Sequence, residues 1–270
     1  MSDIKLLQGD CAEVFKSFDD NTFDLTVTSP PYDNLRLYNG YVFDFEKIAR
    51  QLFRITKPGG VVVWIVGDAT INGSETGTSF KQALYFMECG FNLHDTMIYA
   101  KNGFRFPDSC RYNPIFEYMF VFSKDQPKTK NFICDKKNIY HGSSVARESQ
   151  NRNKDGSLSP NSAWKNNKNK TVKEIGRRDN IWFFSIGGEQ EIGDHPAMFP
   201  EALARDHILS WSNPGDLVLD PMMGSGTTGK MACLYDRNFV GIEISQEYFS
   251  IAEKRIQRVQ QQPKIFEVSQ

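Results

Sequence analysis

Two short motifs, far apart in the sequence, carry residue types that could do chemistry. The first is Ser29-Pro30-Pro31-Tyr32, which follows the strand-like run 22–27. Two successive prolines fix the backbone and remove two N–H donors, so carbonyl acceptors stand beside a hydroxyl and an aromatic ring. At the C-terminal end of a strand, such a set could hold a ligand that presents N–H bonds. The alternative is a rigid turn with Tyr32 packed on the core.

The second motif is a glycine-rich turn. The apolar run 217–219 leads into Asp220-Pro221 and then into Gly224-Ser225-Gly226-Thr227-Thr228. A buried strand that enters a glycine-rich turn and then a helix is the arrangement that wraps a nucleotide-like cofactor. Glycines permit close approach, and we expect Gly226, Thr227 and Thr228 to leave backbone N–H groups free at the helix start. A tight loop that binds nothing is the alternative.

Together the two motifs resemble those of the beta-class (permuted) DNA amino-methyltransferases, in which a Ser/Asp-Pro-Pro-Tyr motif precedes an Asp-Pro-x-x-Gly-Ser-Gly-Thr-Thr motif. The resemblance spans most of the chain. It implies a doubly wound, Rossmann-like α/β sheet with an inserted target-recognition region, and S-adenosylmethionine (SAM) as the cofactor. It also implies that the catalytic residues Ser29, Pro30, Pro31 and Tyr32 hold the target amine.

The resemblance further indicates which residues contact the cofactor. Supporting contacts of the family fall on 8–11, 195–200 and 241–243 of this sequence. For Asp10, a helix N-cap and a cofactor contact are both open. Glu243 follows Asp220 by 23 residues, a spacing that suits an acid binding ribose hydroxyls. The expected cofactor-binding set is Asp10, Thr28, His195, Pro196, Asp220, Pro221, Gly224, Ser225, Gly226, Thr227, Thr228 and Glu243.

The elements that must position these residues follow from hydrophobic periodicity. The pattern predicts helices over 45–56, 79–89, 200–211, 229–235 and 246–259, and strands over 61–66, 92–100, 115–123 and 239–242. We expect 57–60 (Lys-Pro-Gly-Gly) to stop the first helix. We divide the chain into a catalytic half (1–123), the inserted target-recognition region (124–180), a cofactor-binding half (181–260) and a tail (261–270).

The inserted region is basic and rich in asparagine. Residues 124–179 hold fourteen Lys and Arg against six Asp and Glu, a net charge of +8 in a chain whose total is −1. Such a segment suits phosphate contact and base-edge readout, and a solvated, partly disordered loop is the alternative. Likewise, 33–43 suits a loop beside DNA or an ordinary connection. The expected DNA-binding residues are Arg36, Tyr38, Lys165, Lys168, Lys170, Arg177 and Arg178.

Composition excludes several other classes. The five cysteines form no Cys-x-x-Cys pair, which argues against a zinc ribbon or a disulfide framework, and we expect no metal site. Residues 1–5 begin no secretory signal, and the densest apolar run, 61–66, has the length of a strand rather than of a membrane span. A cytoplasmic protein without membrane contact is expected.

The resemblance also bears on the substrate. In the family, serine at the first catalytic position usually accompanies N4-cytosine enzymes and aspartate N6-adenine enzymes, so Ser29 favours cytosine N4 after base flipping. Adenine N6 is the alternative; more distant ones are methylation of RNA or of a protein amide, and a DNA-binding protein that has lost catalysis. Expected partners are double-stranded DNA, a cognate restriction endonuclease and a second copy in a homodimer.

Overall fold

The computed structural model describes residues 2–31, 43–103, 110–145, 150–160, 170–185 and 200–261. The chain divides into two compact units, which we call the sheet unit (Met1–Asn131 and Asn180–Gln270) and the insert unit (Phe132–Asp179). The expected target-recognition region, 124–180, therefore begins within the sheet unit. Lys124 is tied there because its ammonium group donates to the carbonyls of Phe53 and Thr56.

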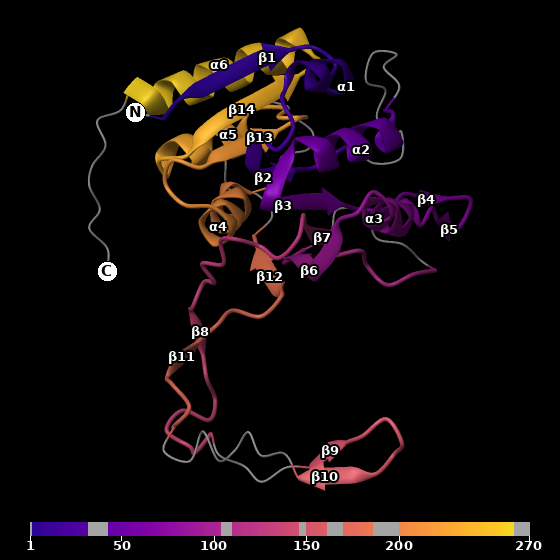
Figure 1. Ribbon diagram of the computed structural model, residues 1–270. Coiled ribbons are helices and arrows are strands. Elements are labelled where there is room, and N and C mark those ends of the chain that lie inside the picture. Colours follow the sequence, from indigo (N-terminus) through magenta and orange to yellow (C-terminus); the bar gives the residue numbers. More distant parts are fainter. Residues whose placement is uncertain are drawn as a thin grey trace. The chain divides into compact units, whose positions relative to one another are not determined.

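One eight-stranded sheet forms the sheet unit. Every pairing in it is parallel except the two made by β7. From β2 the chain proceeds to β3 on one side, and from β13 it proceeds to β14 on the other, which confirms the doubly wound α/β fold. In spatial order the strands are β1 (Ile4–Gln8), β14 (Asn238–Glu243), β13 (Leu217–Asp220), β2 (Phe23–Thr28), β3 (Thr56–Val66), β7 (Phe116–Ser123), β6 (Asn92–Lys101) and β12 (Ile181–Phe184) (Figure 1).

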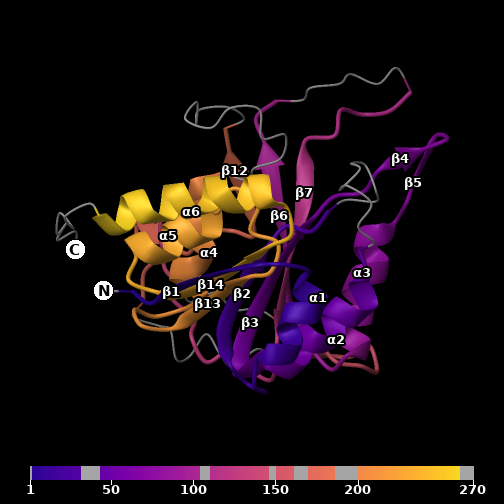
Figure 2. The same cartoon turned by 90° about the horizontal axis from the view of Figure 1, so that it is seen from above.

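Helices cover both faces of this sheet. Figure 2 shows α4 (Glu201–Trp211), α5 (Thr227–Leu234) and α6 (Gln246–Gln261) on one face. The other face carries α1 (Cys11–Val14) with a following 3-10 turn (Phe15–Ser17), α2 (Phe45–Ile55) and α3 (Thr78–Glu88). Each predicted helix is present, with ends that move by one or two residues.

The start of β3 differs from the prediction. Residues 57–60 do not separate helix from strand, because β3 already begins at Thr56 and pairs there with Phe23. The backbone of Lys124 forms two hydrogen bonds with this segment. The Gly59 N–H donates to the Lys124 carbonyl, and the Lys124 N–H donates to the Gly60 carbonyl. These bonds tie the segment to the end of β7, while its backbone is irregular: Gly59 has φ +80°, and the pairing of β3 with β2 shifts register between Phe23 and Leu25.

The core lies between the sheet and its helices. Trp64 on β3 is fully buried, packs against Phe86 of α3, and donates its indole N–H to Gln82 at 2.8 Å. Along α2 the buried residues Ile48, Leu52 and Ile55 fall on one face, as the helical period requires. This packing fixes β3 against its helices, and β3 pairs with β2, after which Ser29-Pro30-Pro31 follows.

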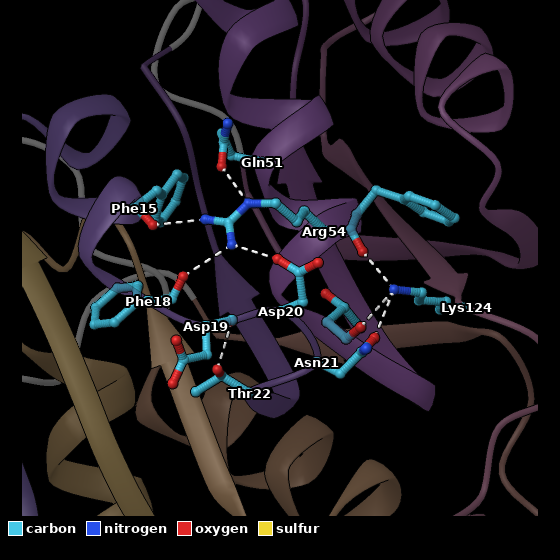
Figure 3. Close-up of polar contacts among 11 residues, drawn as sticks. Phe15, Phe18, Asp19, Asp20, Asn21, Thr22, Gln51, Arg54 and Lys124 are labelled. Atoms are coloured by element: carbon cyan, nitrogen blue, oxygen red, sulfur yellow. Dashed lines mark hydrogen bonds and ion pairs between the residues drawn. The ribbon is translucent and has the colours of Figure 1, made fainter.

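The opposite, N-terminal edge of the central strands is fastened by polar contacts (Figure 3). Arg54 at the end of α2 donates to the carbonyls of Phe15 and Phe18 and to the carboxylate of Asp20, at 2.7 to 2.8 Å. Lys124 also donates to the side chain of Asn21 at 2.8 Å. The loop that leads into β2 is therefore tied to α2 and to the end of β7.

The insert unit has little regular structure. β8 (Lys136–Lys137) pairs with β11 (Ile175–Gly176), and β9 (Gln150–Arg152) pairs with β10 (Leu158–Pro160), both antiparallel. A further hairpin, β4 (Thr70–Ile71) with β5 (Ser74–Glu75), belongs to the sheet unit. Among the described residues, no helix has the length and apolar character needed to span a membrane.

Candidate active site

The two motifs meet at one edge of the sheet. β2 and β13 pair in parallel through Val218 with Leu25 and Leu219 with Thr26, so both strands end on the same side. At that end the Thr28 hydroxyl donates to Asp220 Oδ1 at 2.8 Å, and both residues are buried. The catalytic and glycine-rich motifs therefore leave the sheet from neighbouring strands, as expected of ligand sites in open α/β sheets.

Asp220 organises the start of the glycine-rich turn. Besides Thr28, its Oδ1 accepts the N–H of Met222 at 3.2 Å. Burial raises the pKa of its carboxyl from the ordinary 3.8 to about 6, and the nearby carboxylate of Glu243 adds to the rise. Hydrogen bonds from Thr28, Thr228 and Met222 work in the opposite direction because they favour the charged form.

Glu243 closes the turn from the neighbouring strand. It ends β14, is 8% exposed, and accepts N–H bonds from Gly224 at 2.9 Å and from Ser245 at 2.8 Å. Burial raises the pKa of this carboxyl. Each carboxylate oxygen has two lone pairs, so both keep an acceptor site after these bonds. These free acceptor sites fit a ligand that presents hydroxyl groups, as a ribose does.

The glycines of the turn adopt backbone conformations that other residues rarely enter. Gly224 has φ +49° and Gly226 has φ +82°, and Gly226 N–H donates to the Met223 carbonyl at 2.8 Å. The expectation that Gly226 leaves its N–H free was therefore wrong, because a tight turn precedes α5 and uses that group. The left-handed glycines therefore set the backbone shape of the turn, and that shape decides which backbone groups a ligand can reach.

The hydroxyl groups of the turn are engaged within the protein. Thr228 Oγ1 lies 3.3 Å from the Val27 carbonyl of β2. Ser225 Oγ and Thr227 Oγ1 accept from Arg255 of α6, which also binds Glu201 of α4. Sequence reasoning missed Arg255 and Glu201, because neither lies in a motif and only the packing of α4 and α6 brings them to the turn.

Asp10 lies at the same edge of the sheet. It is the N-cap of α1, and its Oδ1 accepts the Ala12 N–H at 2.8 Å, so the N-cap interpretation is confirmed. The adjoining Gly9 N–H donates to the Glu243 carbonyl at 3.0 Å. Asp10 therefore follows a strand that ends beside Glu243, where a cofactor contact stays a prediction.

The remaining predicted residues fall into two groups. Ser29 and Pro31 are partly buried and Pro30 is buried. Outside the described residues lie Tyr32, Arg36, Tyr38, Lys165, Lys168, His195 and Pro196, and so do most of the loop 33–43 and the tail beyond 261.

Three predicted DNA contacts belong to the described part of the insert unit. Lys170 is exposed. Arg177 places its guanidinium 3.8 Å from the ring centre of Phe132, and Arg178 forms a forked ion pair with Asp135. That pair lowers the pKa of Asp135. Within the described ranges, no cluster of three or more His, Cys, Asp and Glu residues could hold a metal ion.

Comparison with known proteins gives close relatives. A family model described as DNA methylase matches residues 23–254. The orphan methyltransferase M.BamHII of Bacillus amyloliquefaciens is 56% identical over 242 residues, which cover 88% of this chain and 89% of that protein. Two solved structures share the fold. The M1.HpyAVI–SAM complex has a TM-score of 0.62 at 25% identity and covers 93% of this chain and 99% of that one. The cytosine-N4-specific PvuII DNA methyltransferase has a TM-score of 0.68 at 21% identity, covering 96% and 91%.

Proposed function

The chain belongs to the DNA methylase family and is a SAM-dependent DNA methyltransferase, and we propose that the amine it methylates is N4 of cytosine. The observation that most supports methyl transfer to an amine at this site is the hydrogen bond between Thr28 and Asp220 at 2.8 Å. It joins the motif proposed to hold the amine to the motif proposed to hold the cofactor, on adjacent strands. Donor and acceptor of the methyl group can then meet without a large rearrangement.

The cofactor side of the site consists of the turn and the two buried acids. We assign the ribose hydroxyls to Glu243, whose carboxylate keeps acceptor capacity after binding Gly224 and Ser245. Asp220 holds the turn in place by accepting from Met222. Asp10, His195 and the backbone of the turn are proposed to complete the contacts. When bound, SAM supplies a methyl group on a positively charged sulfonium.

The catalytic side has to make an aromatic amine nucleophilic. The lone pair of an exocyclic amine is delocalised into the ring, so the nitrogen attacks poorly while it stays planar. We propose that Ser29 Oγ and the Pro30 carbonyl accept the two N–H bonds and hold the nitrogen as it becomes tetrahedral. Acceptors in these positions stabilise the positive charge that develops on the nitrogen. This stabilisation is stronger in the transition state than in the ground state, so it lowers the barrier.

The base must leave the duplex before it can reach this edge of the sheet. Tyr32 is proposed to stack on the extruded base, a contact worth roughly 1–3 kcal/mol. Arg36, Tyr38 and the basic residues of the insert, Lys165, Lys168, Lys170, Arg177 and Arg178, are proposed to hold the duplex through phosphate contacts and base edges. A cognate endonuclease, a homodimer and a cytoplasmic location stay predictions.

Cytosine N4 is favoured over adenine N6 by Ser29, because serine at this position of the motif usually accompanies N4-cytosine enzymes in the family. Adenine N6 is the second candidate, since both amines are attached beside a ring nitrogen and could bind the same two acceptors. Both candidates use the same site and the same mechanism.

Mass spectrometry of nucleosides tests the assignment. Unmethylated genomic DNA is incubated with the protein and methyl-deuterated SAM, digested and separated. We expect deuterated N4-methylcytosine, formed about a hundredfold more slowly by the Ser29→Ala variant purified in the same way. Deuterated N6-methyladenine without N4-methylcytosine would assign the enzyme to adenine.

A further inference from the structure

We propose that Arg255 is a positioning residue for methyl transfer: its guanidinium fixes the backbone of Ser225–Thr227 in the shape that receives SAM. This role rests on the proposed function of the turn. Arg255 lies on α6, and its side chain is 11% exposed. It belongs to neither motif, and its effect reaches the cofactor only through the residues that it binds.

The contacts of Arg255 bracket one glycine. Its Nη1 lies 2.7 Å from the Ser225 carbonyl, 3.1 Å from Ser225 Oγ and 3.4 Å from Thr227 Oγ1. Gly226, between these two residues, has the left-handed φ of +82°. A guanidinium presents its N–H groups in a rigid plane, so the residues on either side of Gly226 are held by one flat group.

Helix α6 also packs directly on this glycine. A Cβ added to Gly226 would lie 2.9 Å from Ala252 Cβ and 3.3 Å from Ile256 Cδ1. Ala252 and Ile256 are buried, and they flank Arg255 along the helix. The turn thus meets α6 through a steric contact at Gly226 and through polar contacts on both sides of it. Hydrogen bonds are directional, so the polar contacts of Arg255 fix the orientation of Ser225 and Thr227, which packing at Gly226 alone does not determine.

Glu201 holds the guanidinium in place. Its Oε1 accepts from Arg255 Nη2 at 2.8 Å and from Lys230 Nζ of α5 at 2.5 Å, and its side chain is 20% exposed. A cation beside the N-terminus of α5 is unfavourable, because that end of the helix carries partial positive charge. The carboxylate of Glu201 offsets this charge and so allows Arg255 to lie against the first residue of the helix.

The geometry predicts a specific kinetic effect. Loss of the guanidinium releases Ser225 and Thr227, so the turn has to be ordered when the cofactor binds, and cofactor affinity falls. The contacts of Arg255 given above are to the turn and to Glu201, and none of them is to Ser29, Pro30 or Pro31. At saturating SAM the rate of methyl transfer should therefore change little.

The test measures SAM affinity by calorimetry, and kcat and KM for SAM by methylation of DNA, in Arg255→Gln, Arg255→Lys and the control Arg258→Gln. Arg258 is exposed on the same helix. We expect Arg255→Gln to weaken SAM binding about tenfold or more with kcat within about twofold. Arg255→Lys keeps a cation for Glu201 without the planar fork and should show a smaller loss, and Arg258→Gln none.

Two results would overturn the role. One is wild-type SAM affinity in a folded Arg255 variant; the other is a fall of kcat at saturating SAM as large as the loss of affinity. Arg255→Lys supplies the measurement when Arg255→Gln does not fold, which circular dichroism without cofactor detects. Wild-type protein that neither binds SAM nor methylates DNA would instead contradict the proposed function itself.

Discussion

Thr28 and Asp220 are 192 residues apart in the sequence, and a buried hydrogen bond of 2.8 Å joins their side chains. The bond sits where two parallel strands end, so it fixes the directions in which both motifs leave the sheet. The order of the motifs along the chain therefore has no effect on the site. A permuted sequence builds it because strand adjacency, and not sequence order, brings the two halves together.

The raised pKa of Asp220 predicts a pH dependence of stability. In the folded protein the pKa is about 6, against an ordinary value of 3.8, so the native state holds the proton more tightly. The stabilisation from this proton is complete below about pH 4 and is lost as the pH rises through about 6, a change of about 3 kcal/mol.

Asp220→Asn removes this titration while keeping an oxygen acceptor for Thr28 and Met222. Urea denaturation of both proteins at pH 4.5 and pH 7 gives the difference between their free energies of unfolding. We expect this difference to shift in favour of the variant at pH 7, by about 2 kcal/mol, because most of the titration falls between these two pH values. A difference that stays constant with pH would show that the carboxyl titrates as an ordinary aspartate does.

Gly224 should matter for the cofactor and not only for the fold. Its left-handed φ of +49° costs an alanine about 1 kcal/mol of strain. Because its N–H also binds Glu243, a shift of this backbone displaces the acid proposed to hold the ribose. Gly224→Ala should weaken SAM binding about tenfold.

Gly215→Ala is the matched control for that prediction. Gly215 has φ +88°, and an added Cβ there meets no atom within 4 Å, so the variant suffers similar backbone strain away from the site. Calorimetric titration of both variants with SAM should show weakened binding only for Gly224→Ala. Equal affinities in two folded variants would make the turn at Gly224 purely structural.

Much of the fold follows from local sequence patterns. The alternation of apolar residues predicts β6 and β7, and the helical period of Ile48, Leu52 and Ile55 predicts α2, because these signals depend on neighbours in the chain. The start of β3 could not be predicted in this way. Its Pro-Gly-Gly segment predicts a stop, whereas the hydrogen bonds that hold this segment come from the distant Lys124 and Lys128.

The same limit applies to the site. The sequence predicts Asp220, Gly224 and Glu243 as site residues, but the directions in which the two carboxylates point depend on tertiary contacts. Ser225 and Thr227 read as cofactor ligands in the sequence, whereas their hydroxyls bind Arg255, thirty and twenty-eight residues further on. A contact between helices that are separated by a strand leaves no pattern in the sequence.

Arg54 is predicted to serve stability alone. Arg54→Met leaves the carbonyls of Phe15 and Phe18 and the carboxylate of Asp20 without this donor (Figure 3). We expect a loss of about 2 kcal/mol in the free energy of unfolding, measured in urea, with unchanged SAM affinity in the folded protein. Arg50 forms an exposed ion pair with Glu46, so Arg50→Met should lower the free energy of unfolding by less than about 1 kcal/mol. Equal losses in the two variants would contradict this assignment.

The basic insert is predicted to carry phosphate contacts. Neutralising Lys165, Lys168 and Lys170 together should lower the slope of log affinity against log salt by up to about three, because each phosphate contact releases about one counterion. Fluorescence anisotropy with a DNA duplex across a salt series measures the slope. A control that neutralises the exposed Lys5, Lys16 and Lys254 of the sheet unit should leave it unchanged. If the two triple variants lower the slope equally, the lysines of the insert have no special part in binding.

The central claim is that Ser29 acts on the amine and not on the cofactor. The most direct measurement is the single-turnover rate of methyl transfer by Ser29→Ala at saturating SAM and DNA, together with its SAM affinity. We predict a rate about a hundredfold below that of the wild type, the size of effect seen when one transition-state hydrogen bond is removed, with SAM affinity within about twofold. A wild-type rate in this variant would contradict the account.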